Sequence, residues 1–237
     1  MNLSCMYGNS RIEFEVKYRN RATLAIQIAA PGVVTVLSPP GLSPGEIKSR
    51  VEKKAGWIAK KIIHFNRIGN LKEDRRIAEG GKLLYLGKLY PVQINFNKDF
   101  KWLTAKFSGD VFIFNTPVQD HIILKKLAEK LYRRDAEKII FQRFEKYRHK
   151  FNISPLKIKV KEQKRRWGTC TSQRNIYFNW RIIMAPLEAI DYVIVHELCH
   201  LVYQDHSRQF WNCVETIMPG YKKHKKWLKN NGPLLEL

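Results

Sequence analysis

Three histidines and one glutamate fall within eleven residues of the sequence, HELCHLVYQDH at 196–206. On a helix, residues four apart are separated by about 40° around the axis and about 6 Å along it. His196 and His200 therefore point the same way and can bind one metal ion, while the Glu197 carboxylate reaches the same space without ligating. Zinc is bound by imidazole nitrogens, and a catalytic zinc keeps one position open for water. The spacing predicts a zinc site in which Glu197 is the general base.

The alternative is that HExxH occurs by chance, which ordinary residue frequencies produce in roughly one chain in a hundred of this length. The helix itself argues against chance. Its apolar residues do not form one stripe only, since valine, cysteine and tyrosine also surround the two histidines, which indicates a largely buried helix. Buried histidines need polar partners, and a metal ion supplies one for each.

His206 is the expected third ligand. It has the same offset from His200 as the last histidine of the pattern HExxHxxGxxH, although Tyr203 occupies the glycine position of that pattern. A turn through Gln204 and Asp205 can still present His206 to the metal. Glu215, on the following segment, is the competing ligand, and we expect it to support the site or lie at the surface.

The charge of the chain is unusual: 43 Lys and Arg against 21 Asp and Glu give +22 over 237 residues. Such a charge favours anionic partners, for example a nucleotide or nucleic acid bound by the basic surface, but it also fits a soluble enzyme with a basic exterior. The four cysteines form no CxxC pair, and no signal peptide or membrane span is visible. We therefore expect a cytoplasmic protein with reduced thiols and no membrane partner.

The order of the expected elements predicts an α+β fold. Residues 1–117 are rich in strand patterns, with hairpins at Gly87–Lys88 and 108–110 and one helix over 43–63 that opens with Ser43, Pro44 and Glu46. Residues 118–237 contain a long amphipathic helix or a pair of helices, a small antiparallel sheet, the helix that carries HExxH and a last helix ending near residue 219. We expect a β-rich N-terminal region (1–117) and a metallohydrolase domain (118–237), and no internal repeat is visible.

Five segments of the chain resemble the YgjP-like metallopeptidase family, which is related to SprT-type zinc proteases. They are RRWGTC (165–170), NIYFNWRIIMAP (175–186), YVIVHELCHL (192–201), HSRQFW (206–211) and MPGYKKHKKWL (218–228), in the family's order. The resemblance implies a minimal zincin core of gluzincin-like type. It also implies zinc bound by His196, His200 and His206, with Glu197 as general base.

The leading hypothesis is therefore a zinc-dependent metallopeptidase that binds one zinc ion per chain and hydrolyses peptide bonds through a zinc-bound water activated by Glu197. One rival is a metal-dependent nucleotide pyrophosphohydrolase, which the positive charge favours. Against it, the sequence contains neither a P-loop nor the carboxylate cluster that usually holds Mg²⁺ beside phosphates. A second rival is a nucleic-acid-associated protease or binding protein, suggested by the basic tail KKHKKWLK. The residue that stabilises the oxyanion stays open among Tyr203, Arg166, Tyr221 and His224.

Overall fold

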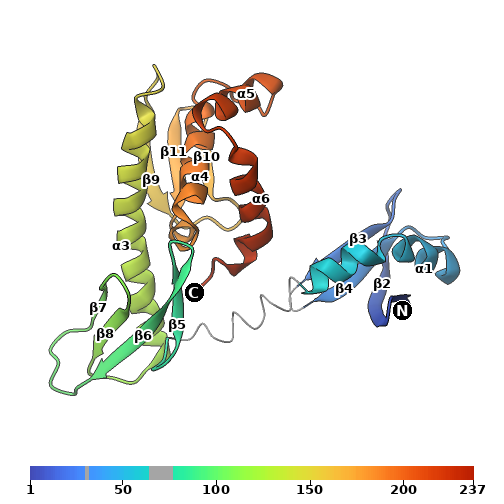
Figure 1. The fold of residues 1–237 in the computed structure, drawn as a ribbon, viewed down its shortest axis with the longest axis horizontal. Coiled ribbons are helices and arrows are strands. Elements are labelled where there is room, and N and C mark those ends of the chain that lie inside the picture. The colour runs from blue at the N-terminus through green and yellow to red at the C-terminus, as the bar shows by residue number, and fades with distance from the viewer. Residues whose placement is uncertain (30–31, 64–76) are drawn as a thin grey trace. The chain divides into compact units, whose positions relative to one another are not determined.

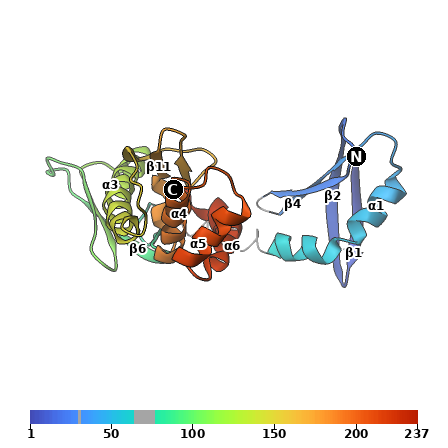
Figure 2. The ribbon, with the colours of Figure 1, turned by 90° about the horizontal axis from the view of Figure 1, so that it is seen from above.

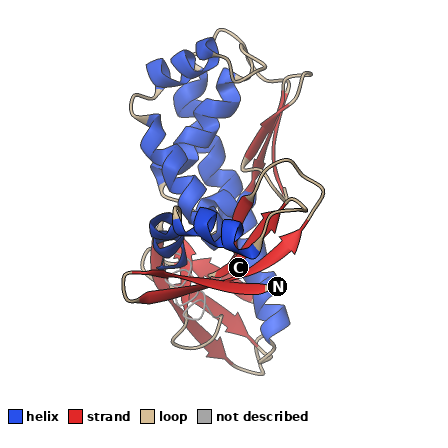
Figure 3. Cartoon of the chain, turned by 90° about the vertical axis from the view of Figure 1, so that its right-hand side faces the viewer, coloured by secondary structure: helices blue, strands red, loops and turns tan. Residues whose placement is uncertain are grey.

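The computed structural model describes residues 1–29, 32–63 and 77–237 (Figure 1). The chain divides into two compact units, Met1–Asp74 and Arg75–Leu237, and each has its own cluster of buried apolar side chains. The boundary between these units lies earlier in the chain than the expected boundary between residues 117 and 118. The division into a β-rich region (1–117) and a metallohydrolase domain (118–237) stays a prediction. Both helices and sheets are present (Figure 3), which confirms the α+β class.

The N-terminal unit is a four-stranded sheet with helices on one side (Figure 2). Its strands are β1 (Asn2–Tyr7), β2 (Ser10–Tyr18), β3 (Ala25–Ala29) and β4 (Val33–Ser38), in the order β1-β2-β4-β3. Helix α1 (Pro44–Glu52) begins with the expected capping box. The Ser43 hydroxyl accepts the Glu46 N–H at 3.3 Å, and Glu46 Oε2 accepts the Ser43 N–H at 2.9 Å. The predicted helix over 43–63 is interrupted by a turn at 53–54 and resumes over 55–63.

The second unit opens with another four-stranded sheet, of order β5-β6-β8-β7. Its strands are β5 (Lys82–Tyr85), β6 (Lys88–Phe96), β7 (Thr104–Phe107) and β8 (Phe112–Thr116). Both expected hairpins are confirmed, because β5 pairs with β6 and β7 with β8 in antiparallel fashion. Gly87 has a φ of 82°, and a Cβ atom there would lie 2.7 Å from Pro186 Cγ. Its N–H donates to Met184 O at 3.0 Å, so this hairpin docks just before the HExxH helix.

The two four-stranded sheets repeat one topology. Both have an antiparallel, a parallel and an antiparallel pairing in the same order, followed by a helix. The registers also correspond: Val16 pairs with Val36, and Ile94 pairs with Phe114, 78 positions further along in both strands (16 to 94 and 36 to 114). The repeat escaped the sequence analysis because the corresponding residues share apolar character rather than identity.

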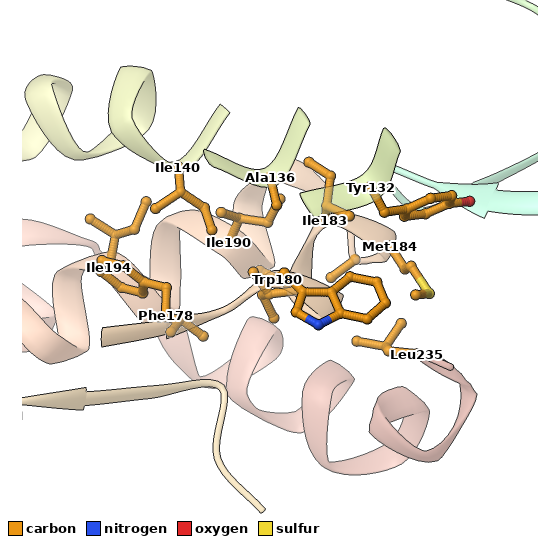
Figure 4. Packing of buried hydrophobic residues seen from close by; sticks show 14 of the residues in the cluster. Tyr132, Ala136, Ile140, Phe178, Trp180, Ile183, Met184, Ile190, Ile194 and Leu235 are labelled. Atoms are coloured by element: carbon orange, nitrogen blue, oxygen red, sulfur yellow. The ribbon is translucent and has the colours of Figure 1, made fainter. Parts of the chain in front are cut away.

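A long helix and a small sheet support the HExxH helix. Helix α3 (His121–Arg148) is a single helix, and its core side chains pack around Trp180 with those of the later elements (Figure 4). The sheet contains β9 (Lys157–Lys161), β10 (Gly168–Cys170) and β11 (Asn175–Asn179), in the order β10-β11-β9. Strand β10 is antiparallel to β11, as expected, whereas β9 pairs with β11 in parallel.

The C-terminal elements are the short helix η1 (Trp180–Met184), α4 (Leu187–Cys199), α5 (Arg208–Ile217), α6 (Tyr221–Asn231) and η2 (Gly232–Leu234). Helix α6 was not predicted, because its lysine-rich sequence was interpreted as a basic tail. It begins after Gly220, whose φ of 76° suits a residue without a side chain. None of the helices in the described ranges has both the length and the apolar content that a bilayer crossing requires.

An ion pair joins α3 to α4. Asp191 is 3% exposed, and its carboxylate accepts hydrogen bonds from Arg143 Nε at 2.6 Å and from the Tyr147 hydroxyl at 2.9 Å. A second Arg143 nitrogen, Nη2, also contacts this carboxylate. The pairing satisfies a charge that would otherwise be buried alone, and so it holds α4 against the long helix.

Candidate active site

Helix α4 carries the two histidines of HExxH and is buried almost all round, as its composition predicts. His196 and His200 are four residues apart on α4 and its C-cap, and their rings lie 4.8 Å apart. His206 joins them from the loop after the helix, with its Nε2 3.1 Å from His196 Nε2. The ligand atoms of the three histidines lie within 4.8 Å of one another.

The turn after α4 brings His206 back to the helix. The N–H groups of Val202 and Tyr203 both donate to Cys199 O, at 3.1 and 2.9 Å. Tyr203 stands where the related pattern has glycine, yet it is not among the described non-glycine residues with positive φ, which are Leu86 and Arg174. The turn therefore needs no left-handed residue at this position, and a tyrosine fits it without backbone strain.

The ring nitrogens are arranged as metal ligands require. His200 Nδ1 lies 3.0 Å from Tyr203 O, so an Nδ1–H donated to this carbonyl leaves Nε2 free as a ligand. Two nitrogens bound to one tetrahedral zinc at about 2.0–2.1 Å would be about 3.3 Å apart, close to the 3.1 Å between His196 and His206. Within the described part of the chain, His196 Nδ1 is buried without a hydrogen-bond partner, so His196 lacks the second hydrogen bond that orients His200. The distance between His196 Nε2 and His206 Nε2 is thus compatible with a cation shared by the two imidazoles.

Two aromatic residues of α5 pack against the histidine rings. Phe210 is fully buried; its ring stacks on His200 at 4.4 Å and meets His196 and His206 edge-on at 4.9 Å. Trp211 stacks on His206 at 5.5 Å. Because rings in contact on this scale restrict one another's rotation, the HSRQFW segment orients the histidines.

Glu197 is the buried carboxylate of the site, with 4% of its surface exposed. Burial raises its pKa to about 8, although the backbone N–H of Cys170 and the charge of Arg166 act in the opposite direction. A metal ion held by the neighbouring histidines would favour the ionised form that a general base needs. Its side chain lies directly against Gly168, where an added Cβ atom would be 2.5 Å from Oε1. A glycine is therefore required at this point of β10 if the carboxylate is to keep its place.

The histidines are in an environment that favours their neutral form. Burial is the main cause, and the neighbouring histidines add to it, so that the pKa of His196 falls to about 3 and that of His200 is lowered. Neutral imidazole is the form that binds a metal. This agrees with the ligand role expected from the spacing.

The site opens into a cleft of about 620 Å³. Glu197 and the three histidines line it together with β10, and its cationic side chains are Arg166, Lys225 and Lys229.

The four residues that the sequence offered as candidate oxyanion donors differ in whether they line this cleft. Arg166 lines the cleft, whereas Tyr203, Tyr221 and His224 are not among its lining residues. Tyr221 is buried and stacks between Tyr192 and Trp211.

Glu215, the competing third ligand, is placed elsewhere. Its Oε1 accepts the N–H of Gly220 at 3.1 Å, and it is outside the histidine cluster. Its carboxylate instead satisfies a backbone donor at the start of α6.

The sequence analysis missed Gly168, Phe210 and Trp211 as parts of the site. They belong to segments that the sequence analysis had singled out, but nothing in their spacing says that they touch Glu197 or the histidines. Their contacts join residues from separate elements.

A buried HExxH helix with a third converging histidine and a carboxylate in a cleft is typical of metal-dependent hydrolases. The model of the YgjP-like metallopeptidase domain matches residues 22–231. The chain belongs to this family and is a metal-dependent peptidase, which confirms the resemblance found in the sequence.

Other comparisons add little. No curated protein matches the sequence. Among solved structures, the crystal structure of the metallopeptidase zymogen of Pyrococcus abyssi abylysin is similar at a TM-score of 0.32 and 19% identity, over 40% of this chain and 92% of that one. That TM-score is too low to support an argument about fold or function.

Proposed function

We propose that the protein is a zinc-dependent peptidase that binds one zinc ion per chain through His196, His200 and His206. The observation that carries the proposal is the convergence of three imidazoles, with ligand atoms within 4.8 Å, beside a buried carboxylate. Three nitrogen ligands with a fourth position open are typical of catalytic zinc sites. The bound ion would polarise the scissile carbonyl and acidify the attacking water.

Glu197 is the proposed general base. Its carboxylate takes a proton from the attacking water and passes it to the nitrogen of the leaving amine. The Cys170 N–H and the close contact with Gly168 fix the carboxylate on the side of the cleft formed by β10. A base held this way needs little reorganisation during the reaction.

A peptide substrate fits the wall of the cleft. Strand β10 lies at one end of the order β10-β11-β9 and lines the cleft through Gly168, Thr169 and Cys170. An extended peptide can add to such an edge through its main chain. Arg166 lies at the same wall, and we propose that it stabilises the oxyanion.

Metal content and turnover of the wild type and Glu197→Gln test this function together. The variant should retain about one zinc per chain while losing hydrolysis of casein-derived peptides. Nucleoside triphosphates belong in the same assay because the rival pyrophosphohydrolase would cleave them. Metal-free wild type after gentle purification, or phosphate release without peptide cleavage, would count against the proposal.

We also propose a cytoplasmic location. All four cysteines are free thiols, which fits a reducing compartment. Imaging of the tagged protein in its own cell tests this.

A further inference from the structure

A second recessed surface lies on the N-terminal unit, whereas the histidine cluster belongs to the second unit. It is a groove of about 730 Å³ between β3 with the residues before it and the segment 50–57, which spans the end of α1, the turn at 53–54 and the start of the next helical stretch. We propose that this groove binds an extended acidic peptide segment as an added strand beside β3. The residues that line it are Ala22, Thr23, Leu24, Ile26, Arg50, Lys53, Lys54 and Trp57.

The strand side of the groove offers an unoccupied edge. In the order β1-β2-β4-β3, strand β3 is the last, and β4 is its one neighbour among the described strands. Its five residues, Ala25–Ala29, span about 17 Å at about 3.4 Å per residue. Backbone groups on such an edge pair readily with an extended chain.

The helix side of the groove determines the charge of the partner. Arg50, Lys53 and Lys54 line it, and no acidic residue is among the described residues that do so. The nearby Glu52 faces Lys48 at 4.0 Å, outside the lining set. Glu46, one helical turn before Arg50, interacts with the charge of Arg50. Because no carboxylate is among the described lining residues, the three cations still favour a partner that carries carboxylates.

The repeat in the fold shows that Arg50 is particular to the first copy, whereas Lys53 has a lysine, Lys130, at the corresponding position. The N-caps Ser43 and Asp120 correspond, and so do the buried Ile47 and Leu124, each 77 positions apart (43 to 120 and 47 to 124). Arg50 therefore corresponds to Leu127, which packs against the core of the second unit. At this position the second unit has Leu127, which packs against apolar side chains, and the N-terminal unit has Arg50, which lines a groove.

The apolar part of the groove favours a peptide over a nucleic acid. Leu24 and Ile26 lie half-buried beside the free strand edge. The phosphates of a nucleic acid can accept from the N–H groups of that edge but offer no donor to its carbonyl groups, whereas a peptide main chain offers both. Trp57, 47% exposed, provides one aromatic surface, whereas proteins that bind single strands stack successive bases on several. A site of this kind recruits a protein through an acidic extended segment, and its binding needs no zinc.

The test uses the full chain with Glu197→Gln, so that a bound peptide is not cleaved. The probe is a fluorescently labelled peptide of about eight residues in which Glu and Val alternate, because alternate side chains of a strand share one face. Its binding is measured by anisotropy at low salt. The groove variant combines Arg50→Glu, Lys53→Glu and Lys54→Glu.

The matched control combines Lys98→Glu, Lys101→Glu and Lys106→Glu, which are exposed residues of the second unit and change the net charge equally. We expect the groove variant to lose at least about tenfold in affinity and the control to lose much less. Alternation of Gln with Val, or N-methylation of alternate peptide amides, should also abolish binding. Circular dichroism verifies that both variants are folded.

Several results would overturn the proposal. They are no binding of the acidic peptide, an equal loss in both triple variants, and unchanged binding of the N-methylated peptide. A thymidine oligonucleotide can be measured in the same way. If the groove variant loses more affinity for the oligonucleotide than for the peptide, the groove is assigned to nucleic acid instead.

Discussion

Gly168→Ala is a sharp test of how the site holds its base. The added Cβ atom would lie 2.5, 2.6 and 2.8 Å from Oε1, Cγ and Cδ of Glu197, whereas carbon atoms in good contact are about 3.5–4.0 Å apart. Either the carboxylate or β10 must therefore move by about 1 Å. A misplacement of about 1 Å costs on the order of a hundredfold in rate, which is about 2.7 kcal/mol of transition-state stabilisation.

The assay compares kcat/KM on a peptide substrate with zinc content and thermal unfolding. We expect a loss of about a hundredfold with zinc retained, because the three atoms nearest to the added Cβ all belong to Glu197 and not to a histidine. Gly45→Ala is the matched control, since a Cβ atom at Gly45 meets nothing within 4 Å. A folded, zinc-loaded Gly168→Ala variant with activity close to wild type would refute the reasoning.

Three further predictions concern the site and its support. Glu197→Gln should lower kcat by at least about a hundredfold, as loss of a general base does, while metal analysis finds zinc unchanged; normal turnover would remove Glu197 from this role. His206→Ala should weaken zinc affinity in a chelator competition far more than Glu215→Ala, because Glu215 accepts a backbone N–H instead, and the reverse ranking would exchange the third ligand. Asp191→Ala should lower the free energy of unfolding in urea by about 3 kcal/mol. This is the low end for a broken buried ion pair, because Arg143 is partly exposed. A loss below about 1 kcal/mol would contradict the role given to this pair.

Local spacing was sufficient for part of the structure. The four-residue interval between His196 and His200 directs both side chains the same way on any helix. The same holds for the capping box at Ser43 and for the hairpin at Gly87, whose geometry depends on a few consecutive residues. These features could be predicted because their interactions are close in the chain.

Choosing among distant partners required the tertiary structure. The spacing left His206 and Glu215 as competing ligands, and only the path of the turn after α4 places the His206 imidazole against the other two. The contact between Gly168 and Glu197 joins a strand to a helix, and the Phe210 ring reaches histidines on two elements.

The sequence by itself determined the type of chemistry, through a helix that carries two histidines and a glutamate. The tertiary structure decided which further residues lie beside that helix, and it revealed the repeated sheet and the basic groove beside β3. The physical reason is that a helix or turn follows from interactions between near neighbours. Packing between distant segments depends on shape and burial, which different residue types can satisfy equally well.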